Sequence, residues 1–368
     1  MHSAAKQGDG YMQEYKYKTC RAVVIERPYE ANLREIKLTE PRKDAFVTKT
    51  TWSAISTGTD MKTYKGIQEP GKVWYPLVPG YENAGIIVTI PDKSADLSYL
   101  PESAQKLKVG DRVMINECRE YADVCGAWGG ASEYSIKDSF TASGSADYMV
   151  KIPDNVTDEQ AVLAYLACVP LKGIKRLTLR DDETIVVFGA GMVGISAIQI
   201  LKILNPSLKI IAIEPNRFRQ GIAERFADYV FSPCEALRKI KDVTNGHMAD
   251  QIIECSGDPS IPGTLHKYLK NGGWGEDDIP GHIHLQADYP EKLLFDYYES
   301  WFTKNPTISM TCALSAGCKE QILQWISEGK FDTKLPYEVW GVSECADAFR
   351  YQNDKGADCF KILFDWSR

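Results

Sequence analysis

The sequence predicts an α/β protein made of a β-rich domain and a doubly wound, parallel-sheet domain. Three features support this fold class. A glycine-rich turn lies in mid-chain between an apolar β-branched run and an apolar helical pattern. Strands and helices then alternate along the second half of the chain, which is typical of a parallel sheet covered by helices on both faces. Short β-like runs broken by Gly, Pro and Asp fill the first part, which indicates a barrel-like β domain.

The glycine-rich turn, GAGMVG, has the spacing G-x-G-x-x-G and directly follows the predicted strand Ile185–Phe188. Glycine triplets occur by chance in loops, but a position between a strand and a helix is what a dinucleotide fingerprint requires. Gly189 permits the tight turn, and Gly191 lets the backbone approach a pyrophosphate. Gly194 lets the helix pack on the strand, and the helix N-terminus presents free N–H groups to the phosphate charge. A βαβ unit without a cofactor is the less favoured alternative.

An acidic residue, Glu214, ends the next predicted strand, Leu208–Ile213, 20 positions after the last glycine. A carboxylate here accepts hydrogen bonds from the adenosine ribose hydroxyls and repels a 2′-phosphate, so NAD is favoured over NADP. In the alternative, Asn216, Arg217 and Arg219 hold the 2′-phosphate of NADP.

The composition is that of an ordinary globular protein. The chain has 368 residues, 44% of them hydrophobic and 25% charged, which suffices for two domains with sizeable cores. The net charge of −7 argues against nucleic acid or an anionic membrane as the main partner. No apolar run approaches the roughly 20 residues of a membrane span, and residues 1–18 are expected to form a polar, disordered extension rather than a signal peptide. The ten cysteines include no C-x-x-C pair and are interpreted as free thiols, so we expect a cytoplasmic protein.

The other predicted elements follow from local patterns. The β-like runs of the front part are Cys20–Ile25, Ala45–Trp52, Gly85–Ile90 and Arg112–Ile115. The apolar periodicity of Ala161–Leu179 predicts a helix that joins the two halves. The elements expected behind the glycine-rich turn are strands at Ala249–Cys255, His282–Gln286 and Cys359–Phe364 and helices at Pro262–Leu269 and Ser343–Tyr351.

Four motifs carry a resemblance to a known family. They are Ser56-Thr57-Gly58-Thr59-Asp60, Pro79-Gly80-Tyr81-Glu82-Asn83-Ala84-Gly85, Val109-Gly110-Asp111-Arg112-Val113 and the GAGMVG turn. With these motifs the chain resembles the medium-chain dehydrogenase/reductase superfamily from about residue 20 to residue 367. The resemblance implies a GroES-like catalytic domain (19–160 and 335–368), a Rossmann domain (161–334) and an active site in the cleft between them. It also implies a homodimer, because relatives usually pair through the edge of the Rossmann sheet.

The chain departs from the zinc-dependent members of that family at the metal ligands. Those members use a Cys in a CGTD-like segment, a His in a GHE segment, and a third Cys, Asp or Glu. The matching positions here are Thr57 and Tyr81, with Cys168 only loosely placed near the third. Threonine and tyrosine cannot replace Cys and His as zinc ligands with useful affinity. We therefore expect no metal, and we interpret His282 and His284 as core or surface residues.

Without a metal, another group must polarise the substrate oxygen and handle its proton. The resemblance places Thr57, Thr59 and Tyr81 around the point where zinc would lie, and Thr59 matches the hydroxyl that relays the proton in many relatives. The phenol of Tyr81 has an ordinary pKa of about 10, which a cation such as Lys62 can lower to suit general acid–base catalysis. In the alternative, Tyr81 only fills the space of the missing imidazole and metal. Glu82 matches a carboxylate beside the site, for which a structural role as hydrogen-bond acceptor is favoured.

A second set of motifs narrows the resemblance. They are Ile55–Thr59, Tyr75–Glu82, Gly126–Ala131 and Asp358–Trp366. These segments look like the 3-hydroxyethyl bacteriochlorophyllide a dehydrogenases, a zinc-lacking branch that oxidises a secondary alcohol on a magnesium-containing tetrapyrrole with NAD. The resemblance implies hydride transfer between the secondary carbinol carbon of a bulky, apolar small molecule and NAD. Two alternatives stay open: a dehydrogenase or reductase of a sugar, cyclitol or natural-product intermediate, and a nucleotide-binding protein without catalysis.

The predicted site residues fall into three groups. The catalytic candidates are Thr59, Tyr81 and Thr57. The substrate-pocket candidates are Glu82 and three aromatic residues of front-domain loops, Tyr64, Trp74 and Trp128. Aromatic faces stack on planar rings, although core or rim packing is the alternative for each of them. The cofactor-binding candidates are Gly189, Gly191, Met192, Val193, Gly194, Glu214, Arg219, Cys255, Ser256 and Ala287.

Overall fold

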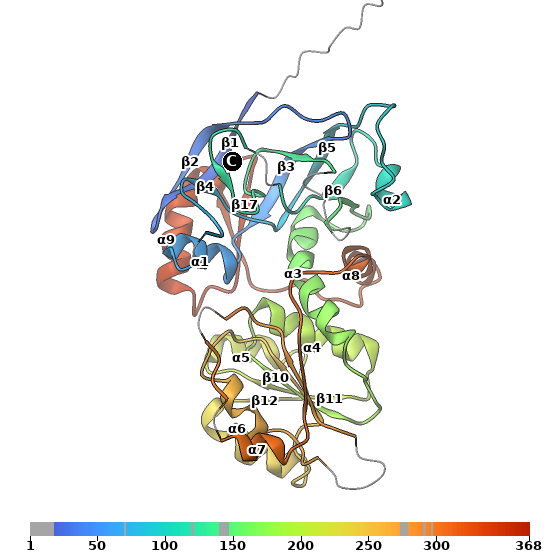
Figure 1. Ribbon diagram of the computed structural model, residues 1–368, viewed down its shortest axis with the longest axis vertical. Coiled ribbons are helices and arrows are strands. Elements are labelled where there is room, and N and C mark those ends of the chain that lie inside the picture. Colours follow the sequence, from blue (N-terminus) through green and yellow to red (C-terminus); the bar gives the residue numbers. More distant parts are fainter. Residues whose placement is uncertain are drawn as a thin grey trace, which may run out of the picture.

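The protein is described by a computed structural model that covers residues 18–69, 71–118, 121–139, 147–272, 279–289, 292–295 and 297–368. The first 17 residues, where the N-terminal extension is expected, lie outside this part. Figure 1 shows a β-rich domain above and an α/β domain below, with helix α3 (Asp158–Ile174) running between them. None of the helices in the described ranges is both long and apolar enough to cross a membrane.

The β-rich domain contains two sheets. The larger sheet has the strand order β16-β17-β3-β5-β6-β9, with β8 paired to β3, and the smaller has the order β2-β1-β4-β7. The strands are β1 (Thr19–Arg27), β2 (Glu30–Lys37), β3 (Phe46–Ala54), β4 (Leu77–Val78), β5 (Asn83–Thr89), β6 (Arg112–Met114), β7 (Cys125–Gly126), β8 (Tyr134–Lys137), β9 (Val150–Lys151), β16 (Glu338–Gly341) and β17 (Ile362–Asp365). The helices are α1 (Thr59–Lys65), α2 (Glu102–Gln105), η2 (Val342–Glu344) and α9 (Cys345–Lys355).

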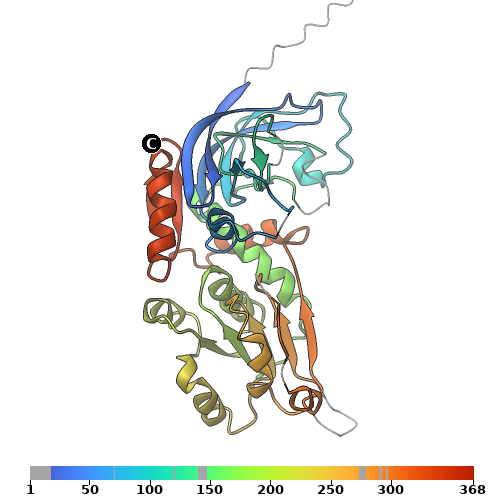
Figure 2. The ribbon, with the colours of Figure 1, turned by 60° about the vertical axis from the view of Figure 1, so that its left-hand side comes forward.

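The C-terminal segment returns to the β-rich domain. Strand β17 pairs with β3 in antiparallel register, so that Phe364 lies opposite Ser53. Helix α9 packs beside β2, and Figure 2 shows this red helix alongside the blue strands. The last strand therefore lies beside β3, which ends just before the predicted hydroxyl residues Thr57 and Thr59.

The second domain is built on six parallel strands in the order β12-β11-β10-β13-β14-β15. This doubly wound parallel sheet confirms the predicted fold class. The strands are β10 (Thr184–Phe188), β11 (Lys209–Ile213), β12 (Tyr229–Phe231), β13 (Gln251–Glu254), β14 (His282–Leu285) and β15 (Thr307–Met310). The helices are α4 (Met192–Leu204), α5 (Arg217–Ala223), α6 (Pro233–Val243), η1 (Pro262–Lys267), α7 (Tyr298–Phe302) and α8 (Cys318–Ser327). All five residues of β10 are buried, which explains its continuous apolar run.

Helix α3 ties the two domains together. It starts at a capping box, in which the hydroxyl of Thr157 accepts the N–H of Gln160 and the Gln160 amide oxygen accepts the N–H of Thr157. The helix packs against α4 and α8 on one side and against β3 and β5 on the other. One hydrophobic core therefore contains residues of both domains, such as Met114 and Ile195.

One predicted element differs in type. The segment Pro262–Leu269, expected as an ordinary helix, forms the short 3₁₀ helix η1. Pro262 and Gly263 are poor α-helix formers, so little favours a longer α-helix at this point.

Candidate functional site

The glycine-rich turn lies at the carboxyl end of β10, where the strand order of the parallel sheet reverses. In doubly wound sheets, ligands bind in the crevice at this point. Gly189 has a φ of +85°, and a Cβ there would lie 2.9 Å from the Cα of Ser256. A Cβ on Gly194 would lie 1.8 Å from the carbonyl oxygen of Gly189. Both positions therefore require glycine, for the reasons that the sequence predicted.

Gly191 leaves open space in front of helix α4. A Cβ at this position would have a single neighbour within 4 Å among the described residues, the Nη1 of Arg219 at 4.0 Å. No described side chain caps the N-terminus of α4, so the first N–H groups of this helix are free to bind an anion. The Nε of Arg219 is buried and has no hydrogen-bond partner within the described ranges. Free amides and a guanidinium with an unused donor fit a diphosphate.

Glu214 lies beside the same turn at the end of β11. Its carboxylate is only 4% exposed and accepts the N–H of Ala190 at 2.7 Å and that of Asn216 at 2.9 Å. Each carboxylate oxygen can accept a second hydrogen bond, so the group can also bind ribose hydroxyls. Arg219 donates from Nη2 to the carbonyl oxygen of Gly356 at 2.7 Å, which joins α5 to the end of α9. The only cation of the alternative NADP site that stands exposed is Arg217.

The loops after β13 and β14 complete the predicted cofactor side. Ser256 donates both its N–H and its hydroxyl to the buried carboxylate of Glu254, and the hydroxyl of Tyr289 donates to the same group. The N–H of Ala287 donates to the carbonyl oxygen of Glu254 at 3.1 Å. Burial raises the pKa of the Cys255 thiol well above its ordinary value, so this cysteine stays protonated. Glu254 and Tyr289 were missed in the sequence, because nothing local shows that they hold two loops together.

Three hydroxyl groups meet on the facing side, in the β-rich domain. The phenol oxygen of Tyr81 lies 2.6 Å from the Oγ of Ser56 and donates to the Oγ1 of Thr59 at 3.2 Å. The N–H of Thr59 donates to the Oγ of Ser56 at 3.3 Å. Two of the three predicted catalytic residues are thus in contact. The third position is taken by Ser56 in place of Thr57, whose half-exposed side chain has no hydrogen bond to the other described residues.

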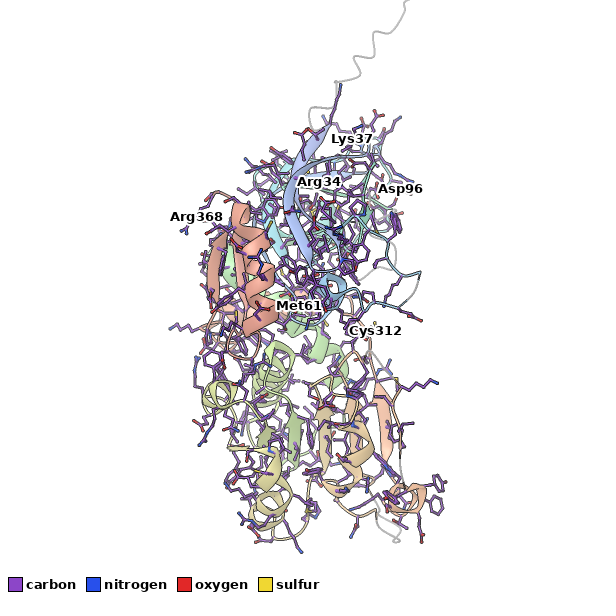
Figure 3. The ribbon with its side chains drawn as sticks, turned by 90° about the vertical axis from the view of Figure 1, so that its left-hand side faces the viewer. Arg34, Lys37, Met61, Asp96, Cys312 and Arg368 are labelled. Atoms are coloured by element: carbon purple, nitrogen blue, oxygen red, sulfur yellow. The ribbon has the colours of Figure 1, made fainter. Side chains whose placement is uncertain are left out.

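The surroundings of Tyr81 keep its phenol neutral. Burial, followed by the negative charges of Glu82 and Asp60, raises its pKa far above the ordinary value. The ammonium of Lys62, considered as a cation that lowers this pKa, instead pairs with the carboxylate of Asp288 at 2.7 Å. The structure therefore contradicts a lowered pKa for Tyr81. The Lys62–Asp288 pair links α1 to the loop after β14, at the domain junction where Figure 3 shows the α1 residue Met61.

Two buried carboxylates lie next to the hydroxyl groups. Asp60 accepts the N–H of Ser56 at 2.8 Å and that of Gly80 at 3.0 Å, and burial raises its pKa to about 7. Glu82 forms an ion pair with Lys361 of the C-terminal segment at 2.6 Å, and both side chains are fully buried. Burial raises the pKa of Glu82, and Lys361 opposes that rise. Glu82 is therefore enclosed in protein, away from any substrate pocket.

The aromatic candidates have different surroundings. The Trp128 ring lies edge-on to Tyr81 with centroids 6.2 Å apart, whereas Trp74 is 66% exposed. Tyr64 lies in the core of the β-rich domain and donates its hydroxyl to the carbonyl oxygen of Tyr29, which contradicts its predicted place in the substrate pocket. An aromatic residue missed in the sequence, Tyr165 of α3, packs on Tyr81 with centroids 5.0 Å apart.

Comparison with known families agrees with this geometry. A model of the alcohol dehydrogenase GroES-like domain matches residues 43–154, and a model described as zinc-binding dehydrogenase matches residues 192–274. The chain belongs to the medium-chain dehydrogenase/reductase superfamily. Membership in this superfamily makes it an oxidoreductase of the alcohol dehydrogenase type, which acts on a CH–OH group.

Three proteins are examples of those to which the chain is similar. The 2-desacetyl-2-hydroxyethyl bacteriochlorophyllide A dehydrogenase of Cereibacter sphaeroides is 27% identical over 354 residues, which cover 94% of this chain and 98% of that protein. D-xylulose reductase A of Aspergillus niger is 27% identical over 221 residues, which cover 54% of this chain and 58% of the reductase. The crystal structure of an Escherichia coli protein described as a short chain alcohol dehydrogenase complexed with NADH has a TM-score of 0.76 and 22% identity, and the match covers 95% of this chain and all of that one.

The side chains at the superfamily's metal position do not fit a zinc ion. Both oxygens of Asp60 accept backbone amides, and Glu82 is taken by its ammonium partner. The thiol of Cys168 donates to the carbonyl oxygen of Ala164, and burial raises its pKa far above the ordinary value. In the described part of the chain, no three Cys, His, Asp or Glu side chains form a group suited to a metal. Zinc requires a tetrahedron of such donors.

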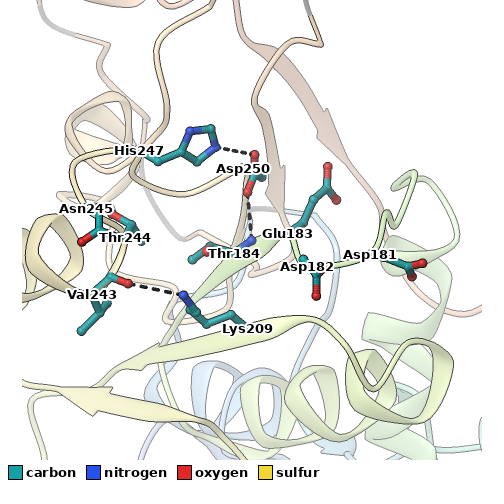
Figure 4. Close-up of a pocket in the computed structure, with 10 residues that line it drawn as sticks. All are labelled: Asp181, Asp182, Glu183, Thr184, Lys209, Val243, Thr244, Asn245, His247 and Asp250. Carbon is teal, nitrogen blue, oxygen red and sulfur yellow. Dashed lines mark hydrogen bonds and ion pairs between the residues drawn. The ribbon is translucent and has the colours of Figure 1, made fainter.

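A separate cavity of about 350 Å³ lies at the opposite edge of the parallel sheet, beside the first residues of β10 and β11 (Figure 4). Asp250 is bonded there to the imidazole of His247 at 2.9 Å and to the N–H of Thr184 at 2.9 Å. This is the amino-terminal edge of the strands, whereas ligands of such sheets bind at the carboxyl edge. The cavity is therefore not part of the candidate active site.

Proposed function

We propose that this oxidoreductase transfers a hydride between the carbinol carbon of a secondary alcohol, or the corresponding ketone, and NAD without a catalytic metal. The observation that carries the proposal is that the hydroxyl group of Tyr81 contacts those of Ser56 and Thr59. Tyr81 is one of the two positions that match zinc ligands of the zinc-dependent relatives. These groups offer the substrate oxygen a hydrogen-bond donor and a route for its proton.

The cofactor side is proposed to hold NAD with its diphosphate on the N-terminus of α4. Gly191 leaves the space, Arg219 supplies a positive charge, and Glu214 accepts the adenosine ribose hydroxyls. Backbone groups of Cys255, Ser256 and Ala287 lie at the carboxyl ends of the next strands and are proposed to contact the nicotinamide half. Bound NAD supplies the hydride acceptor, and the protein supplies orientation and a dry site. NADP is less favoured because Glu214 repels a 2′-phosphate.

The neutral phenol defines how the proton leaves. During oxidation, the substrate hydroxyl donates its proton to the Tyr81 oxygen while Tyr81 donates its own to the Oγ1 of Thr59. Thr59 is half-exposed and passes a proton to water. Ser56 donates a hydrogen bond to the Tyr81 oxygen and holds it in place. This relay moves one proton through neutral groups, so it does not require an ionised tyrosine.

The substrate is proposed to be bulky and apolar. Trp128 and Tyr165 flank Tyr81 with aromatic surface, which suits a planar ring system. The relative that acts on a bacteriochlorophyllide aligns with nearly the whole chain, which favours a tetrapyrrole of this type. A polyol is the second candidate, because the D-xylulose reductases align with about half of the chain.

A turnover panel tests the proposal. Purified protein is incubated with NAD and either a hydroxyethyl chlorin or a set of polyols and secondary alcohols, and NADH is followed by absorbance. Turnover of the chlorin alone supports the first substrate class, and turnover of a polyol alone supports the second. NAD binding without turnover of any alcohol or ketone, together with no effect of Tyr81→Phe, would instead indicate a nucleotide-binding protein without catalysis.

We further propose a homodimer that pairs through β15. This strand is the edge of the parallel sheet, and its residues Ile308 and Met310 are 41% and 62% exposed. An edge strand with free backbone groups readily pairs with a second copy. Light scattering should give twice the chain mass of 41.2 kDa.

A further inference from the structure

Lys319, in the first turn of α8, is a fully buried lysine outside the proposed reaction centre. Only 1% of it is exposed. Its ammonium donates to the Oδ1 of Asn116 at 2.9 Å and to the carbonyl oxygen of Tyr148, and it lies 3.6 Å from a carboxylate oxygen of Asp147. Burial lowers the pKa of Lys319, and the negative charge of Asp147 opposes that change.

The charges around Lys319 do not form a simple ion pair. Lys137 is also buried and contacts the other carboxylate oxygen of Asp147. Two ammonium groups therefore share one carboxylate. Replacing buried ionic groups by well-packed apolar side chains of similar size is often neutral or even stabilising. Fold stability alone therefore does not explain a lysine at this position.

The amide of Asn116 connects this lysine to Tyr81. Its Oδ1 accepts from Lys319, and its Nδ2 donates to the carbonyl oxygen of Tyr81 at 3.0 Å. The backbone N–H of Asn116 donates to the Oδ1 of Asn83 at 2.6 Å. Asn116 has a φ of +64°, a left-handed conformation that asparagine tolerates better than most residues. The side chain thus bridges α8 and the segment that carries the reactive phenol.

The two ends of this bridge belong to different parts of the fold. Helix α8 follows β15, whose carboxyl end lies on the cofactor side of the parallel sheet. Tyr81 belongs to the β-rich domain and faces Tyr165. Lys319 therefore ties the chain behind the cofactor site to the backbone of Tyr81.

We propose that Lys319 is a positioning residue that, through Asn116, fixes the backbone of Tyr81 and hence the place of its phenol relative to the reacting carbon. This inference rests on the proposed function, in which Tyr81 contacts the substrate oxygen. Lys319 itself contacts neither substrate nor cofactor. Loss of the ammonium leaves the Asn116 amide without its anchor, so the Tyr81 segment gains freedom.

Two variants and their combination test the link. Lys319→Met removes the charge and keeps a side chain of similar volume. If this variant does not accumulate in the cell, Lys319→Gln is used in its place. Asn116→Gly removes the bridging amide and keeps the left-handed backbone without strain. Lys106→Met, which breaks the exposed pair with Glu102, is the control. For each protein we would measure the rate of hydrogen exchange in the peptide 79–85. We would also measure kcat and KM with the substrate found in the turnover panel.

The expected result is faster exchange of that peptide in both single variants and an approximately tenfold lower kcat with an unchanged KM for NAD. Because both changes break one link, the double variant should show no larger effect than the stronger single variant. Additive effects on kcat, or unchanged exchange of the peptide, would overturn the inference. Hydrogen exchange can be measured without turnover. If the wild-type protein is inactive, the proposed function is refuted, but the exchange data still show whether Lys319 and Asn116 fix the Tyr81 segment.

Discussion

The buried ion pair between Glu82 and Lys361 leads to a specific stability prediction. Both side chains are fully buried, and the pair joins Glu82, the neighbour of Tyr81, to Lys361, directly before the last strand β17, at 2.6 Å. The second carboxylate oxygen of Glu82 has no hydrogen-bond partner among the described residues, so the charge depends on Lys361. Removing one partner of such a pair leaves a lone buried charge. We therefore expect Lys361→Met to lower the free energy of unfolding by about 3–5 kcal/mol at pH 8.

The loss should be smaller at low pH. Burial raises the pKa of Glu82, and the opposing effect of Lys361 is absent in the variant. The folded variant therefore binds a proton more readily than the unfolded chain, in which glutamate titrates near pH ~4.3. Stabilisation by this proton is fully present below that pH and is lost as the pH rises through the folded-state pKa. Above ~4.3 the variant should lose about 1.4 kcal/mol per pH unit until Glu82 ionises in the folded state.

Urea titrations at pH 5.5 and pH 8 measure this effect. Lys106→Met is the control, because both partners of its pair with Glu102 are exposed to solvent, so the free energy of unfolding should stay unchanged. The double variant Glu82→Gln with Lys361→Met should recover much of the loss at pH 8, since no lone charge remains. A loss below ~1 kcal/mol at pH 8, or an equal loss at both pH values, would refute the reasoning.

The remaining predictions concern the site. Gly191→Ala should leave the melting temperature unchanged but abolish NAD binding in calorimetry, because its Cβ enters the open space, and unaltered affinity would contradict the diphosphate position. Gly194→Ala should lower the melting temperature, because its Cβ overlaps the Gly189 carbonyl; an unchanged melting temperature would show that the turn can relax. Tyr81→Phe should lower kcat about 100-fold and Thr59→Val about tenfold, and wild-type rates in both would exclude the proton relay. Dialysis against a chelator should leave activity unchanged, whereas parallel loss of zinc and activity would establish a metal-dependent reaction.

The glycine-rich turn was predictable because its requirements are local. A tight turn after β10 and a helix packed on that strand require glycine at 189 and 194 whatever the rest of the chain does. The alternation of strands and helices likewise follows from neighbouring residues. Glu254 and Tyr289 show the limit of this approach, since they are 35 positions apart and meet only when β13 and β14 pair.

The catalytic side was less predictable because it depends on how a short turn points its side chains. Ser56, Thr57 and Thr59 are all hydroxyl residues in one motif, and only the start of α1 at Thr59 decides that Ser56 faces Tyr81. The role of Lys62 was predicted wrongly for a similar reason. Its partner, Asp288, is 226 residues away and belongs to the other domain.

The aromatic residues illustrate the role of burial. Tyr64 was predicted to line the substrate pocket, but α1 turns its ring towards the exposed Tyr29 and the core residue Phe349. Tyr165 lies in an apolar helical stretch that predicts only packing, yet its ring covers Tyr81. Both outcomes depend on helix orientation, which the order of residues along the chain does not specify.

A crystal structure with bound NAD, measured at the zinc absorption edge, tests the central claim most directly. We expect the diphosphate on residues 189–194, the adenosine ribose at Glu214, and no anomalous peak beside Tyr81. A diphosphate bound elsewhere, or a metal coordinated next to the three hydroxyl groups, would contradict a metal-independent, NAD-linked oxidoreductase.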